Sequence, residues 1–186
     1  MHAEHSSFQA EKLEHVILFF LERINNITLG RTKLMKLLYY VDFDHCEKTG
    51  RPITNANYRK LPHGPVPDEA EDVIEKMVKA GAVQEVQRPV GSFTQHRLLT
   101  DKAKFDAAIF SGDEIETLES VAKRWCQASA KEIEKASHRE APWATTEDGK
   151  TIDYEMAEYR SPCDDGDEID WLAKSDEFKK LVSSLA

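Results

Sequence analysis

The chain has 186 residues, enough for one compact domain, and its 40% hydrophobic and 32% charged residues are typical of a globular protein. Its 34 acidic residues outnumber its 25 basic residues, and the net charge of −9 argues against a nucleic acid or an anionic membrane surface as the main ligand. Cys46, Cys126 and Cys163 form no C-x-x-C pair and no signal peptide is evident, so we expect a cytoplasmic protein without a zinc knuckle or redox dithiol.

Apolar residues recur every three or four positions over residues 8–24 and again over residues 31–48, which predicts two helices. The first has one apolar face, as expected for a helix on the surface of a core. In the second helix, Met35, Tyr39, Tyr40 and Phe43 widen the apolar face well beyond that. We therefore expect the helix over residues 31–48 to be the central one.

Residues 51–65 contain three prolines and Gly64, which predicts an ordered loop. A third helix is expected to follow, with Pro67 in its first turn and Gly81 at its end. The apolar pattern then changes over residues 82–99, where short runs around Pro89-Val90-Gly91 predict a β-hairpin.

Two capping boxes, Ser111 with Glu114 and Ser129 with Glu132, predict two further helix starts after a short helix over residues 102–108. Residues 152–159 are expected to be helical, residues 164–170 to form an acidic loop, and residues 175–185 to form an amphipathic helix. The predicted fold class is mainly α, a compact multi-helix domain with one small β-hairpin. The domain is expected over residues 1–150, with a C-terminal helical extension over 151–186 packed on it or on a partner.

Two segments outside the helical pattern are candidate functional elements. The sequence His63-Gly64-Pro65-Val66-Pro67 is either a stiffened loop that grips a partner or a rigid turn that leads into a helix. In Ser137–Trp143, His138 and Glu140 are an acid–base pair or, together with Glu132, metal ligands. The alternative is that His138 caps the end of a helix and Trp143 fills the core. The structural interpretation is favoured, because no second histidine-rich segment accompanies the pair.

Three segments stand out when taken in order: Lys33-Leu34-Met35-Lys36-Leu37-Leu38-Tyr39, Gly64-Pro65-Val66, and Ser137-His138-Arg139-Glu140-Ala141-Pro142-Trp143. Together they resemble the Panacea domain, the SocA-like antitoxin family also described as phage-associated protein. The likeness spans about Leu29 to Trp143. The resemblance implies a helical antitoxin that neutralises a protein toxin by direct contact, with no cofactor and no enzymatic activity. The chain departs from the family at Pro62-His63, where an aromatic residue commonly precedes the glycine.

We therefore predict a non-enzymatic binding protein whose partner is a cognate toxin, with no catalytic or metal-binding residues. The expected contacts lie between the second helix and the 63–66 loop: Tyr40, Tyr58, His63, Gly64, Pro65, Val66, His138 and Trp143. Tyrosine and tryptophan are frequent in such contacts. Two alternatives stay open. One is an adaptor that delivers its partner to a protease through the C-terminal helix, and the other is a hydrolase or transferase that uses His138 and Glu140.

Overall fold

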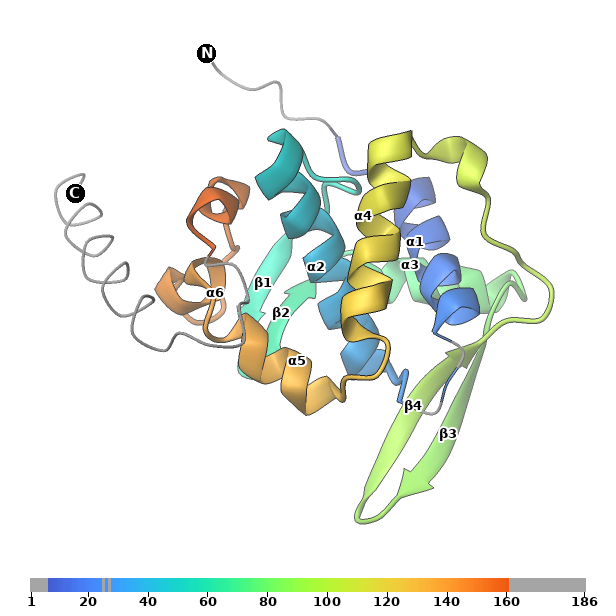
Figure 1. The fold of residues 1–186 in the computed structure, drawn as a ribbon. Coiled ribbons are helices and arrows are strands. Elements are labelled where there is room, and N and C mark those ends of the chain that lie inside the picture. Colours follow the sequence, from blue (N-terminus) through green and yellow to red (C-terminus); the bar gives the residue numbers. More distant parts are fainter. Residues whose placement is uncertain (1–6, 25, 27, 161–186) are drawn as a thin grey trace, which may run out of the picture.

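A computed structural model describes residues 7–24, 26 and 28–160 of the chain (Figure 1). Helices predominate, as predicted, and the described residues contain two antiparallel two-stranded sheets rather than the single hairpin expected. The elements in chain order are α1 (Ala10–Arg23), α2 (Arg31–Thr49), β1 (Tyr58–Leu61), β2 (Gly64–Pro67), α3 (Ala70–Lys79), β3 (Gln84–Val90), β4 (Phe93–Leu99), η1 (Ala107–Ile109), α4 (Gly112–Trp125), α5 (Ala130–Ser137), α6 (Ala141–Thr145) and η2 (Tyr154–Tyr159).

Helix α2 is the centre of the fold, as its wide apolar face predicted (Figure 1). It packs against α1, α4, α5, β2, β4 and η2. Every residue from Lys33 to Phe43 is buried, because neighbours cover the helix on all sides. The helix ends at Gly50, which adopts a left-handed conformation with φ of 76°.

A polar row winds along α2 and consists of Lys36, Tyr39 and Asp42, spaced three residues apart so that each neighbours the next along the helix. All three are at most 1% exposed. A buried polar group is costly unless it is hydrogen-bonded, so each must be matched by a partner on another element. The polar row therefore fixes where the surrounding segments lie.

Asp42 shows how fully the buried polar groups of this row are satisfied by hydrogen bonds. Its carboxylate accepts hydrogen bonds from the backbone N–H groups of Ile53 (2.9 Å) and Thr54 (2.7 Å), from the Thr54 hydroxyl, and from the phenols of Tyr58 (2.9 Å) and Tyr154 (3.3 Å). Burial raises the pKa of this carboxyl, while these donors act in the opposite direction. One side chain thus ties α2 to the following loop, to β1 and to η2.

The β1–β2 hairpin occupies the segment predicted as a loop, so that prediction was wrong. Tyr58 pairs with Pro67 and Leu61 with Gly64, and Pro62-His63 forms the turn. Two prolines fit into β2 because, among the described residues, this strand pairs with β1 alone and its other edge is unpaired, so a missing N–H group costs little there. The same pairing draws Pro67 into the strand, and α3 begins three residues later than expected, at Ala70.

The other local predictions have mixed outcomes. The hairpin over 82–99 is confirmed as β3 and β4, which project from the body of the molecule as an arm (Figure 1). Both capping boxes are present with reciprocal hydrogen bonds. Residues 102–108 do not form the expected helix, and only the single 3₁₀ turn η1 is found there. Residues 154–159 are helical, but the helix is of the 3₁₀ type.

Residues 151–160 pack on the domain. The Ile152 N–H donates to the Tyr58 carbonyl (2.7 Å), and Ala157 and Arg160 are buried next to α2 and α6. The predicted acidic loop over 164–170 and the predicted helix over 175–185 lie outside the described residues. Within residues 7–24, 26 and 28–160, no helix is long and apolar enough to cross a membrane.

Replacing Asp42 with alanine is expected to lower the free energy of unfolding by about 3 kcal/mol, because several buried donors lose their acceptor at once. Urea denaturation measures the change. Asp101→Ala, at an exposed position, is the matched control and should change the free energy of unfolding by no more than about 0.5 kcal/mol. Equal effects of the two substitutions would contradict the role assigned to Asp42.

Candidate partner-binding surface

The β1–β2 hairpin presents a tip, made of Leu61, Pro62 and His63, at the surface of the domain. All three residues are exposed, and the His63 side chain is 83% exposed. The tip is held from beneath by Lys36, whose Nζ donates a hydrogen bond to the backbone carbonyl of His63. The turn is therefore fixed through its backbone while its side chains point to solvent.

Lys36 is itself nearly inaccessible, at 1% exposed. Burial lowers the pKa of this amine to about 8, and Glu134 partly offsets the shift. At neutral pH the ammonium is charged, and a charged donor makes a stronger hydrogen bond to the carbonyl than a neutral one. The position of the hairpin tip thus depends on a buried amine.

Glycine is the residue type that fits at position 64, between Lys36 and α5. Its φ is +107°, a conformation that side chains with a Cβ rarely adopt. A Cβ atom placed here would lie 2.8 Å from Lys36 Nζ and 3.2 Å from Ser137 Oγ. Ser137 is fully buried, and its hydroxyl donates to the Glu134 carbonyl (3.0 Å). The glycine is therefore the contact point of the hairpin, α2 and α5.

A buried ion pair lies further along α2. The Glu140 carboxylate accepts from the Tyr39 phenol (2.9 Å) and from Arg160 Nε (2.9 Å) and Nη2 (3.0 Å). Arg160 Nη1 reaches Asp44 at 2.7 Å and Glu47 at 3.5 Å. The Arg160 side chain is 4% exposed and the Glu140 side chain 3%. This network fastens the start of α6 and the end of the described chain to the central helix.

Next to the hairpin tip, three side chains form a stack at the end of α5. The His138 and Trp143 rings lie nearly parallel, with centroids 3.8 Å apart, and Lys60 Nζ lies 4.2 Å from the Trp143 ring centroid. Trp143 Nε1 donates to the Leu61 carbonyl (3.3 Å). Partial burial lowers the pKa of His138, so its imidazole is neutral at physiological pH. The stack supports the hairpin tip from the side.

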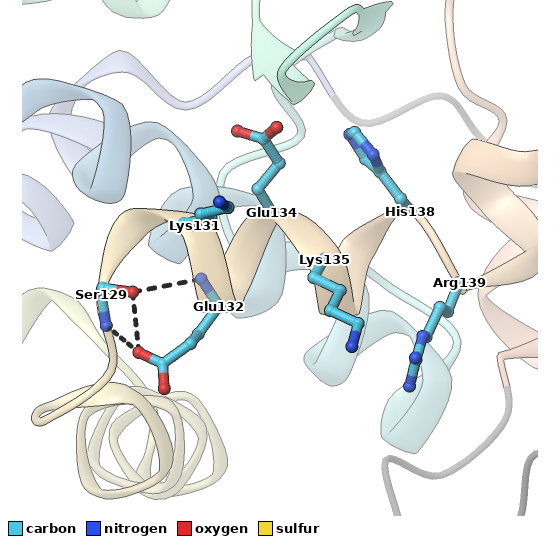
Figure 2. A pocket seen from close by; sticks show the side chains of 7 residues that line it. All are labelled: Ser129, Lys131, Glu132, Glu134, Lys135, His138 and Arg139. Carbon is cyan, nitrogen blue, oxygen red and sulfur yellow. Dashed lines mark hydrogen bonds between the residues drawn. The ribbon is translucent and has the colours of Figure 1, made fainter.

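The exposed side of α5 completes this surface. His63 Nδ1 lies 3.6 Å from the Glu134 carboxylate, which links the tip to the helix. Figure 2 shows an open depression along α5, with Glu134 and His138 on one side and Lys135 and Arg139 on the other. The hairpin tip, the His138–Trp143 stack and this side of α5 thus form one continuous surface, which we call the tip–α5 surface.

The structure divides the predicted contact residues into two groups. Tyr40 and Tyr58 are both 0% exposed. A side chain without accessible surface cannot touch a partner, so these two predicted contacts are corrected to core residues. Gly64 and Pro65 are buried and Val66 is partly buried, so they shape the hairpin. The exposed His63 and the partly exposed His138 and Trp143 lie together on the tip–α5 surface.

The catalytic alternative finds little support in this geometry. Glu140 is 2% exposed, and its carboxylate is already engaged by Tyr39 and Arg160. His138 follows α5 as its C-cap residue, as the structural interpretation proposed. Among the described residues, no group of three or more His, Cys, Asp or Glu side chains could hold a metal ion.

Sequence reasoning missed two residues on which this region depends. Asp42 stands amid apolar residues in Tyr40-Val41-Asp42-Phe43, and a charge inside a buried stripe is itself a signal that partners converge on it. Arg160 carried no such signal, because it follows the predicted helix over residues 152–159 and belongs to no apolar pattern. Only the fold brings it to Glu140, twenty residues earlier in the chain.

Gly64→Ala is expected to lower the free energy of unfolding by about 2–3 kcal/mol, through backbone strain and the clash with Lys36 and Ser137. Gly50→Ala is the matched control, since Gly50 has φ of +76° but no atom within 4 Å of an added Cβ. It should cost only about 1 kcal/mol. If the two variants unfold at the same denaturant concentration, the contact assigned to Gly64 is wrong.

Lys36 gives the stability a specific pH dependence. The unfolded amine keeps its proton up to about pH 10.5, whereas the folded one loses it near pH 8. Between these values the unfolded state binds more protons, so stability rises with pH. The free energy of unfolding of the wild type minus that of Lys36→Met should therefore increase from pH 8 to 10.5, by up to about 3 kcal/mol. A difference that is flat or falls over this range would contradict the assignment.

Comparison with known proteins identifies the family of this chain. The model of the family described as "Antitoxin SocA-like, Panacea domain" matches residues 34–144, more than half of the chain. The matched region contains most of α2, the β1–β2 hairpin, α5 and nearly all of α6. No curated protein and no solved structure gives a significant match. The chain therefore belongs to the SocA-like antitoxin family and carries its Panacea domain.

Proposed function

We propose that this protein is an antitoxin that binds a cognate protein toxin and neutralises it by direct contact through the tip–α5 surface. The observation that carries the proposal is membership of the antitoxin family. The geometry adds a rigid, exposed element to which such a partner can bind. The hairpin tip is held by Lys36, Gly64 and the Trp143 contact, and its own side chains face solvent.

A fixed tip suits recognition of a folded protein. Binding costs less free energy when the contacting segment is already ordered, because less conformational entropy is lost. Leu61 offers apolar surface, at 37% exposed, and His63 offers hydrogen-bonding groups beside Glu134. An apolar group bordered by polar ones is the usual composition of a protein interface.

The charge distribution favours a protein partner over a nucleic acid. Lys33 and Lys36 are at most 1% exposed and cannot contact a phosphate backbone. Arg59 pairs with Asp68 at 2.6 Å, and Lys60 lies 3.3 Å from Asp148. The net charge of −9 makes the chain as a whole repel a phosphate backbone, which disfavours a nucleic acid as the main partner.

Co-expression with the product of the adjacent open reading frame tests the function. The neighbour alone is expected to arrest growth, and this protein is expected to restore growth and to co-purify with it. A harmless neighbour, or two products that never associate, would overturn the proposal. Measuring toxin abundance in the same cells separates direct neutralisation from delivery to a protease, since only delivery lowers the amount of toxin.

The double variant Leu61→Ser with His63→Asp tests the surface. It should weaken toxin capture at least roughly tenfold, because a few residues dominate most interfaces. Its unfolding midpoint should not change, since both side chains are exposed. Phe93→Ser is the matched control, an exposed apolar residue on the distant β3–β4 arm. Undiminished capture by the double variant would place the interface elsewhere.

A further inference from the structure

His138, the residue that follows α5, connects this helix to the hairpin tip through one intervening ring (Figure 2). Its imidazole stacks on the indole of Trp143, with the ring centroids 3.8 Å apart and the ring planes inclined by only 12°. On the hairpin side, Trp143 Nε1 donates to the Leu61 carbonyl at 3.3 Å. The direction of this N–H group therefore depends on how the imidazole packs against the indole.

One nitrogen of the imidazole has an unusual environment. His138 Nε2 is buried and has no hydrogen-bond partner in the part of the chain that the structure describes. A neutral imidazole can leave this nitrogen unprotonated, because its single proton then lies on Nδ1. The protonated ring carries an N–H group on both nitrogens, so it would bury a charged donor without an acceptor, which is strongly unfavourable. The stacked position therefore selects the neutral ring.

The charges around His138 mostly oppose a positive charge on the ring. The titratable groups that face it and disfavour its charge are Lys36 on α2, Lys60 on β1 and His63 in the turn. Glu134 on α5 is the carboxylate that favours the charge, and α6, with the sequence APWAT, contributes no titratable side chain. Lys60 Nζ already lies 4.2 Å from the Trp143 ring centroid, so a second cation at this indole is repelled.

We propose that His138 is a positioning residue of the tip–α5 surface, whose neutral ring holds Trp143 against the Leu61 carbonyl and whose protonation releases this side of the tip. Lys36 keeps its hydrogen bond to the His63 carbonyl, so the domain stays folded while the tip becomes less constrained. Because the tip belongs to the surface that we propose binds the toxin, its release also weakens capture. This consequence for capture rests on the proposed function.

The direction of the pH dependence follows from proton binding. A released imidazole is surrounded by water and titrates near the ordinary pKa of 6.5, whereas burial lowers the pKa of the stacked imidazole of His138. Between these two values the released state binds more protons than the stacked state. Stacking is therefore complete at neutral pH and weakens as the pH falls below 6.5.

Nitrogen–proton NMR spectra of the free protein test the positioning role without a toxin. The Trp143 Nε1–H signal, assigned with Trp143→Phe, should shift between about pH 7.5 and 5, with the same midpoint as the His138 ring. The Nε1–H signal of Trp125, whose indole belongs to the core, is the internal reference and should not shift. A Trp143 signal that stays constant while His138 titrates would overturn the proposal. Joint shifts of both indole signals would indicate unfolding of the domain instead, and would overturn it as well.

Matched variants separate titration from packing. His138→Phe keeps an aromatic ring against Trp143 but cannot gain a proton, so its Trp143 signal should not change over this pH range. His138→Gln has a smaller planar group that does not titrate either, and the same result is expected if phenylalanine disturbs the fold. His63→Gln is the control, because it removes the neighbouring histidine, 3.6 Å from Glu134, and should leave the Trp143 shift intact. A wild-type shift in both His138 variants, or no shift in His63→Gln, would contradict the role of His138.

Capture of the product of the adjacent open reading frame measures the consequence for binding. The wild type should bind it several-fold more weakly at about pH 5.5 than at neutral pH, and at most about tenfold, because the ordinary pKa of 6.5 is the upper limit for the ring. Dividing the wild-type dissociation constant by that of His138→Phe at each pH removes the titration of the partner. A ratio that stays constant would overturn the consequence for capture. If no form of the protein captures the partner, the proposed function fails, and the indole signal still decides the role of His138.

Discussion

The polar row on α2 is the constraint on which the other elements depend. A charged or phenolic side chain buried in a core is tolerated only when specific partners surround it. Lys36 requires the carbonyl of the hairpin turn, Tyr39 requires Glu140 at the start of α6, and Asp42 requires the loop after α2, together with β1 and η2. Hydrophobic contacts would allow these segments to slide over α2, whereas directional hydrogen bonds allow one arrangement. The row sets both the positions and the registers of its neighbours.

This arrangement explains why three short motifs, far apart in the chain, belong together. Lys36 comes from the first, Gly64 from the second, and Ser137 and Glu140 from the third. In the folded domain the first three meet at a single contact, and Glu140 binds Tyr39 one helical turn away. The motif residues therefore build the scaffold. The side chains of the hairpin tip, which a partner can reach, lie between the motifs in the sequence.

Much of the fold follows from local patterns. The periodicity of α1 and α2, the two capping boxes and the change of period before β3 each depend on neighbours within one or two turns, so the sequence contains them in full. The β1–β2 hairpin was not predicted from the sequence, because its prolines disfavour a strand in the local pattern. It forms because the Lys36 and Asp42 hydrogen bonds hold both ends of the hairpin in place.

The candidate site was harder to predict for a different reason. A tyrosine has the same character in a core as at an interface, and only three-dimensional packing decides which applies. Tyr58 reads as a loop aromatic in the sequence, yet its phenol is a donor to Asp42 and its ring is fully enclosed. His63, by contrast, was assigned to the surface because proline and glycine on either side indicated a turn, and turns lie at the surface.

Lys36 holds the hairpin tip through a main-chain carbonyl, an atom that every amino acid at position 63 would supply. The Lys36 hydrogen bond therefore does not depend on which side chain occupies position 63. The side chains at positions 61–63 can therefore be exchanged without removing the hydrogen bond that fixes the turn. This makes the tip a suitable site for grafting new sequences onto the domain.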